Sequence, residues 1–167
     1  MPPFGQIPIE QITQLPLLHR ATITDDYLDA MGHMNVRWYL ALFDEAGWRL
    51  FEQFGMDMAY YQQNAAGAFA LQHIIRYLAE VHAGDTVAIY GRLLGRTDKR
   101  IHVMCFMVNE TQGLLAATIE ELGSHADLTA RRTAPMPPDI TDRLDAVIAA
   151  HSALDWDAPI SGAIKLK

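Results

Sequence analysis

One short stretch, residues 29–35, combines side chains suited to chemistry with a position directly before a predicted helix. It reads Asp-Ala-Met-Gly-His-Met-Asn. A helix that begins near Asn35 points its first unpaired backbone N–H groups back toward these residues, and the helix dipole adds positive potential there. Asp29, His33 and Asn35 would then surround a position that favours developing negative charge.

Each of these residues also has a simpler structural role. A carboxylate at Asp29 could attack an electrophile or activate water, but an aspartate before a glycine turn is commonly a turn or capping residue. His33 either orients a ligand and holds Asp29 or is a partly exposed loop histidine. Gly32 lets the backbone approach a ligand or serves an ordinary loop. Asn35 suits a helix N-cap better than a direct catalyst.

The segment that follows, residues 36–54, is predicted to be a helix that is buried on most sides. Gly55 provides a stop signal. Trp38, Leu42 and Trp48 lie outside the main apolar stripe, so apolar surface covers most of the circumference and other elements should wrap the helix. The stripe itself recurs at spacings of three and four, and it comprises Val36, Tyr39 or Leu40, Phe43, Gly47, Leu50, Phe51 and Phe54.

From residue 67 onward, the apolar period changes from helical to two, which is typical of strands. A short strand at 20–24 precedes the site, and polar turns separate the later ones. We expect the four long strands to form an antiparallel meander, and a short strand, a buried helix and a meander together predict an α+β fold with a curved sheet around the helix. The long strands are predicted at residues 67–80, 86–95, 100–109 and 114–129.

Composition and the positions of the prolines predict the domain organisation. Prolines among polar residues predict an irregular leader at 1–18, followed by one domain at 19–137 and a short helix with a tail at 138–167. With 50% hydrophobic and 20% charged residues, the 167-residue chain resembles an ordinary soluble globular protein. No secretory signal or membrane-spanning run is visible, so we expect a cytoplasmic protein with no membrane partner.

Several function classes are disfavoured by the same composition. A formal net charge of −7 argues against a broad nucleic-acid-binding surface. The single cysteine, Cys105, cannot form an internal disulfide, and its alternating apolar surroundings indicate a buried small side chain. The histidines lack the spacing of metal ligands, so no metal is predicted.

Three motifs in this order carry a resemblance to a known family. Asp-x-x-Gly-His-x-Asn is followed after four residues by Tyr39, Glu45 precedes Ala46 within the helix, and a strand ends at residues 76–78 before the Gly-Asp turn at 84–85. Over roughly residues 21–137 the chain resembles the hotdog-fold acyl-CoA thioesterases of the 4-hydroxybenzoyl-CoA thioesterase type.

The chain departs from the family pattern at two positions and is similar to one branch of the family. Many relatives carry an acidic residue where this chain has Tyr27, and a second asparagine where it has Val36. The Gly-His-Met-Asn form, together with residues 116–122 and 125–127, is similar to a branch associated with carnitine breakdown. Some members of that branch hydrolyse betainyl-CoA.

The resemblance implies hydrolysis of a small or medium acyl-CoA to the free acid and CoA, with coenzyme A as part of the substrate and no separate cofactor. Asp29 would act as nucleophile or general base, and the backbone N–H of Val36 would polarise the thioester oxygen. Glu45 is the rival base, since a helix carboxylate serves in another branch; otherwise it is a surface partner of Arg49.

Substrate contacts and partners are further expectations. Trp38 and Tyr39 would line an acyl pocket or belong to the core. Arg96, Lys99 and Arg100 would meet the coenzyme A phosphates or remain solvated in a turn. Exposed sheet edges and the resemblance imply a homodimer or homotetramer. The alternative function is a non-catalytic acyl-CoA-binding or metabolite-binding module, which would need the helix N-terminus but no carboxylate beside it.

Overall fold

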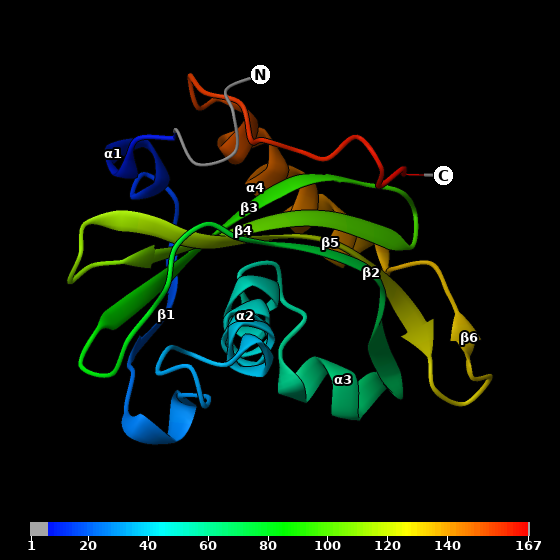
Figure 1. Ribbon diagram of the computed structural model, residues 1–167. Helices are drawn as coiled ribbons and strands as arrows, with labels where there is room; N and C mark the ends of the chain where they lie inside the picture. Colours follow the sequence, from blue (N-terminus) through cyan, green and yellow to red (C-terminus); the bar gives the residue numbers. More distant parts are fainter. Residues whose placement is uncertain (1–6, 167) are drawn as a thin grey trace. The chain divides into compact units, whose positions relative to one another are not determined.

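The computed structural model describes residues 7–166, and Figure 1 shows its helices and strands. Helices and an antiparallel sheet share the chain, so the predicted α+β class is confirmed. In chain order the elements are α1 (Ile9–Ile12), β1 (Leu17–Thr22), the 3-10 turn η1 (Asp25–Tyr27), α2 (Val36–Glu52), α3 (Met58–Asn64), β2 (Ala66–Tyr77), β3 (Thr86–Arg96), β4 (Arg100–Asn109), β5 (Leu114–Asp127), β6 (Arg132–Thr133) and α4 (Pro138–Ser152).

Two compact units make up this part of the chain. The first contains the described residues up to Arg49 together with Ile75–Gly91 and Cys105–Ile119. The second contains Leu50–Ile74, Arg92–Met104 and the residues from 120 onward. Each long strand contributes one part to each unit. The predicted division into leader, domain and tail stays a prediction.

The strand order differs from the predicted meander at one strand. The sheet runs β1-β3-β4-β5-β2, and β6 pairs with β5. β3, β4 and β5 follow each other as expected, but β2 pairs with β5 rather than with β3, so the four-strand meander is wrong. Alternation shows which faces a strand presents, but it does not identify the strand's partner. β1 is antiparallel to β3, with Ala21 opposite Val87.

Helix α2 begins at Val36, as predicted, and ends at Glu52. The prediction that it is buried on most sides is wrong, because Val36, Leu40 and Trp48 are 59, 40 and 41% exposed. The spacing of apolar residues reveals an apolar surface, but it does not show whether the same chain covers that surface. The residues that are buried share one face and are Tyr39, Leu42, Phe43, Ala46 and Leu50.

Smaller differences concern the ends of the chain and the connection after α2. The predicted leader extends from residues 1–6, which lie outside the described residues, into α1 and the start of β1, so its remainder is not wholly irregular. The segment 56–66 contains α3, whose N-cap Asp57 accepts a hydrogen bond from the Tyr60 N–H at 2.8 Å.

Cys105 is buried, as expected. Within residues 7–166, no helix is long and apolar enough to cross a membrane.

Candidate active site

The loop before α2 folds into a small hairpin. Leu28 and Met34 form an antiparallel bridge, and the Asp29 N–H donates to the His33 carbonyl at 3.0 Å. The Gly32 N–H donates back to the Asp29 carbonyl at 3.1 Å. Gly32 has a φ of +82°, a conformation that glycine adopts at little cost, so its first role is to form this turn.

Backbone contacts fix both ends of the hairpin within the first unit. The Met34 N–H donates to the Val81 carbonyl at 2.7 Å, and the Asn35 N–H donates to the Tyr27 carbonyl at 2.9 Å. The Trp38 ring packs on the Tyr27 ring with centroids 4.5 Å apart. The loop is therefore held on a rigid support, and Trp38 contributes to that support.

Asp29 fills the structural one of the two roles that the sequence left open, and the catalytic role stays a prediction. Its Oδ1 accepts a hydrogen bond from the Met31 N–H at 2.8 Å, as a turn aspartate does. Its Oδ2 lies 3.8 Å from Nδ1 of His33, and the side chains of Asp29 and His33 are 25 and 32% exposed. Within residues 7–166, Oδ2 accepts no hydrogen bond, so one oxygen fixes the turn while the other stays open to a ligand.

The N-terminus of α2 presents an unused donor. Oδ1 of Asn35 accepts a hydrogen bond from the Arg37 N–H at 3.1 Å, and its carbonyl accepts one from the Trp38 N–H at 2.9 Å. Asn35 thus caps the helix, as the sequence suggested. In the described part of the chain, none of the hydrogen bonds uses the Val36 N–H. This N–H can therefore donate to a substrate oxygen.

A cavity of about 270 Å³ opens beside this helix terminus. Its walls include His33, Val36 and Tyr39 from the loop and helix, and residues 77–80, which comprise the last residue of β2 and the three that follow it. Of the residues predicted to act on or bind substrate, the structure thus gathers these three at one cavity. Asp29 lies next to the cavity-lining His33, whereas Trp38 and Gly32 are not among the residues that line the cavity.

Tyr39 forms an apolar wall of this cavity. Its ring meets the Tyr77 ring edge to face, with centroids 5.0 Å apart and planes at 80°. Its hydroxyl donates to the Ala79 carbonyl at 3.4 Å. Burial raises the pKa of Tyr39 to about 12, and the nearby Tyr77 and Glu80 add to the shift. The hydroxyl therefore stays protonated and serves as a structural donor near neutral pH.

Glu45 is exposed and lies nine residues after Val36 in α2. At 1.5 Å of rise per residue, it lies about 13 Å along the helix axis from the terminus. That separation exceeds the reach of its side chain, so Glu45 and the Val36 N–H of one chain do not contact the same carbonyl. Its role as a base stays a prediction.

The predicted phosphate-binding residues belong to the second unit, around the turn between β3 and β4. The Arg96 guanidinium donates to both carboxylate oxygens of Asp145, at 2.6 and 2.5 Å. Lys99 fixes the backbone through its carbonyl, which accepts from the His125 N–H at 2.8 Å. The Arg100 N–H donates to a threonine hydroxyl within the turn at 3.0 Å. Contact with coenzyme A phosphates stays a prediction for all three side chains.

A second carboxylate–histidine pair, in the second unit, was not singled out from the sequence. Nε2 of His102 lies 2.9 Å from Oε1 of Glu120. The other Glu120 oxygen accepts a hydrogen bond from the Ser161 N–H at 2.6 Å. Counting back from the predicted turn at 110–113 would have placed the two residues within one position of facing each other. Within residues 7–166 no group of three or more His, Cys, Asp or Glu side chains suits a metal ion.

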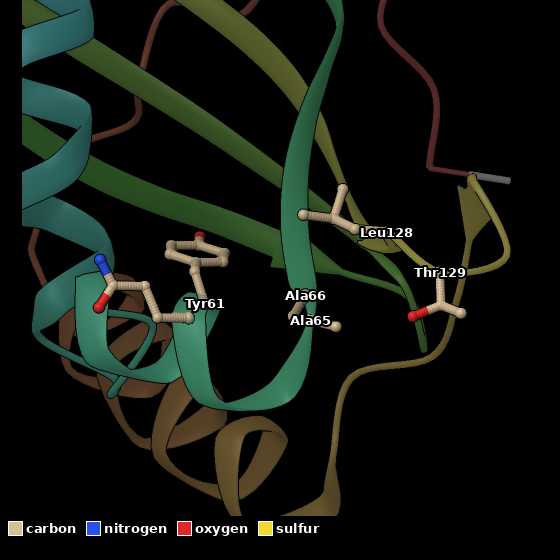
Figure 2. Close-up of a pocket in the computed structure, with 6 residues that line it drawn as sticks. Tyr61, Ala65, Ala66, Leu128 and Thr129 are labelled. Atoms are coloured by element: carbon tan, nitrogen blue, oxygen red, sulfur yellow. The ribbon is translucent and has the colours of Figure 1, made fainter.

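The second unit also has a cavity, of about 410 Å³, which Figure 2 shows in close-up. No carboxylate or histidine lines it, so it lacks the groups that acid–base or nucleophilic chemistry needs. Its lining residues are Tyr61, Gln62, Ala65, Ala66, Leu128 and Thr129.

Comparison with known proteins identifies the family of this chain. The model of the thioesterase-like superfamily matches residues 23–144. The chain belongs to this superfamily. It is 36% identical over 154 residues to an L-carnitine dehydrogenase/betainyl-CoA thioesterase of Agrobacterium fabrum, covering 90% of this chain and 31% of that protein. It is 27% identical over 143 residues to a betainyl-CoA thioesterase of Pseudomonas aeruginosa, covering 86% of this chain and 90% of that protein.

Solved structures confirm the hotdog fold that the motifs implied. A Staphylococcus aureus protein solved in complex with CoA superposes with a TM-score of 0.80 at 21% identity. A Pseudomonas putida protein described as a putative thioesterase superposes with a TM-score of 0.75 at 25% identity. Each match covers 92% of this chain and 97% of the other.

Proposed function

We propose that the chain is an acyl-CoA thioesterase whose site lies at the N-terminus of α2. One observation carries the proposal: His33 and the unused Val36 N–H meet at one cavity, and the open Oδ2 of Asp29 lies 3.8 Å from the His33 ring. An acyl transfer site needs a donor for the carbonyl oxygen and a nucleophile or base beside it. The superfamily membership supports the same reaction class.

Two routes fit this arrangement. In both, the thioester oxygen accepts a hydrogen bond from the Val36 N–H, which stabilises the negative charge that develops on it. In the nucleophilic route, Asp29 attacks the carbonyl carbon, the CoA thiolate leaves and water cleaves the resulting anhydride. In the general-base route, Asp29 takes a proton from water as the water attacks, and the CoA thiolate leaves. His33 holds the ligand and Asp29 in either case.

For the substrate, we propose a small acyl-CoA, with betainyl-CoA as the first choice. The support comes from the names of the Agrobacterium fabrum and Pseudomonas aeruginosa relatives. A cavity of about 270 Å³ has room for a short acyl group.

We also propose that the enzyme is a homodimer or homotetramer. β2 ends the strand order of the sheet, and its residues are mostly exposed or half-buried. An exposed edge strand is a template for pairing, and the exposed apolar residues Val36, Leu40 and Trp48 of α2 add a surface that a second copy would cover. Light scattering at micromolar concentration tests this, and a monomer would contradict it.

The activity is tested by the release of free thiol from a panel of CoA esters: acetyl, medium-chain, aryl and betainyl. We expect turnover of betainyl-CoA well above the uncatalysed rate. If no ester releases thiol, the protein is a binding module instead.

Oxygen-18 water then addresses the two routes, with enzyme in excess over substrate. Label that enters the protein in the first turnover identifies an Asp29 anhydride that water opens at the Asp29 carbonyl. Label found only in the product acid is compatible with the general base and with attack on the acyl carbonyl of the anhydride.

A further inference from the structure

The cavity at α2 contains a carboxylate that the reaction scheme leaves unused. Glu80 lies after the end of β2 and is the only acidic residue in the cavity wall within the described chain. We infer that Glu80 selects acyl groups with a fixed positive charge, holding the cation against the Tyr39–Tyr77 pair. This inference rests on the proposed thioesterase function and assigns the specificity of the same site.

The charge of Glu80 is available, unlike that of its neighbour Asp85. One oxygen of Asp85 accepts hydrogen bonds from the His82 N–H, the Asn109 amide and the Gln112 amide, at 2.9, 2.7 and 2.8 Å. Glu80 accepts no hydrogen bond among the described residues, and its side chain is 67% exposed. Its nearest ionisable contact is Nε2 of His82 at 3.5 Å. Asp85 therefore serves the structure, whereas Glu80 can serve a ligand.

The two tyrosines supply the second half of a cation site. A quaternary ammonium group has no N–H to donate, so proteins hold it with aromatic faces and nearby negative charge. Tyr39 and Tyr77 stand at 80° to each other, and Tyr77 is 50% exposed. Tyr39 itself is only 4% exposed, so the Tyr77 ring and the Glu80 carboxylate would contact such a group while Tyr39 supports the Tyr77 ring.

The proposed carbonyl donor and the proposed cation site share one cavity. Val36 lines the same cavity as Tyr77 and Glu80, and its N–H is the proposed donor to the thioester oxygen. A cationic group one methylene beyond the thioester carbonyl would lie within this cavity while the carbonyl faces the helix terminus.

The experiment compares betainyl-CoA with 3,3-dimethylbutyryl-CoA, in which carbon replaces the quaternary nitrogen, so shape is kept and charge removed. We expect wild-type protein to prefer the cationic ester in kcat/KM. Glu80→Gln should lower kcat/KM for betainyl-CoA about tenfold, a modest value because the carboxylate is largely exposed. The uncharged ester should change less than about twofold. Glu80→Asp should retain most of the preference, and Glu10→Gln, on the short helix α1, should change neither value.

Binding of the two non-hydrolysable thioether analogues, measured by calorimetry, separates this inference from the proposed function. An affinity ratio that collapses in Glu80→Gln supports the role of Glu80 even if wild-type protein releases no thiol, a result that would overturn only the thioesterase. A ratio unchanged by Glu80→Gln, or an equal loss for both compounds, would overturn the role of Glu80 even in an active enzyme.

Discussion

We compare two carboxylate–histidine pairs of this protein, which differ in whether the carboxylate keeps an oxygen that accepts no hydrogen bond from the described residues. In the first unit, Asp29 and His33 are separated by 3.8 Å and are 25 and 32% exposed. In the second unit, Glu120 and His102 are separated by 2.9 Å and are 0 and 9% exposed. The shorter, more buried pair has the stronger interaction, yet it is the weaker candidate for chemistry.

The reason is the number of open positions. Both oxygens of Glu120 are occupied, one by His102 and one by the Ser161 N–H, so this carboxylate fixes the C-terminal segment against the sheet of its unit. Asp29 uses one oxygen for its turn and leaves the other open next to a histidine at a cavity. A group that acts directly on a substrate needs an unfilled position for the reacting atom, and Glu120 has none.

The largest expected effect on turnover comes from the Asp29–His33 pair, called the open pair because one Asp29 oxygen is unbonded within residues 7–166. Asp29→Asn should lower kcat on the order of a hundredfold or more with KM nearly unchanged, because it removes the reactive oxygen and keeps the turn's hydrogen-bond acceptor. Steady-state thiol release measures this, with circular dichroism to show that the loop variant is folded. A loss in KM alone would mean that Asp29 binds substrate and performs no chemistry.

The Glu120–His102 pair, called the closed pair because both Glu120 oxygens are bonded, should affect stability and not turnover. Glu120→Gln should reduce the free energy of unfolding by about 2 kcal/mol, because a buried hydrogen-bonded charge is replaced while its partners stay buried. Urea unfolding measures the loss. kcat should remain within about twofold of wild type. Glu121→Gln is the matched control, since that carboxylate lies 3.4 Å from Nε2 of His73 but is 27% exposed, and such pairs contribute about 1 kcal/mol or less.

A pH effect is expected from the same unit. Nδ1 of His151 accepts the Leu93 N–H at 2.9 Å, so the ring must be neutral at that nitrogen. Burial, with help from Arg92, lowers the pKa of His151 below its usual 6.5. Below that pH the unfolded chain binds a proton that the folded chain does not, so stability falls as pH decreases from about 6.5 toward the lowered pKa.

Replacing His151 tests the predicted direction in which the free energy of unfolding changes with pH. The free energy of unfolding of His151→Gln should depend less on pH than that of wild type between pH 7 and 5, by at most about 1.4 kcal/mol per pH unit. Identical slopes would show that His151 titrates alike in both states. Turnover by the open pair should not follow this slope at temperatures where both proteins are folded.

Much of this comparison could be anticipated from local patterns, but part of it could not. The start of α2 at Val36, the hairpins among β3, β4 and β5, and the loop carrying Asp29 and His33 all follow from spacing and turn residues near in sequence. The pairing of β2 with β5 joins strands that are far apart in sequence. The alternation of apolar residues does not show which of the possible strands is the partner.

The same limit applies to side chains. The turn role of Asp29 was predictable, but its split between a bonded and an open oxygen depends on hairpin geometry. The exposed face of α2 was missed because apolar spacing does not reveal what covers a helix. Glu80 was not singled out from the sequence, since its significance arises from the cavity that Tyr39 and Tyr77 form with it.

The smallest expected effect concerns Glu45, the rival carboxylate. It lies about 13 Å along α2 from the Val36 N–H, so within one chain it does not reach a carbonyl bound there. Glu45→Gln should therefore change kcat/KM for betainyl-CoA by less than about twofold, under the conditions used for Asp29→Asn. Equal and large losses at both positions would point to a shared role, with Glu45 acting from another subunit. A large loss at Glu45 alone would move the base onto the helix and leave Asp29 as a turn residue, which would reverse the functional contrast between the two carboxylate–histidine pairs.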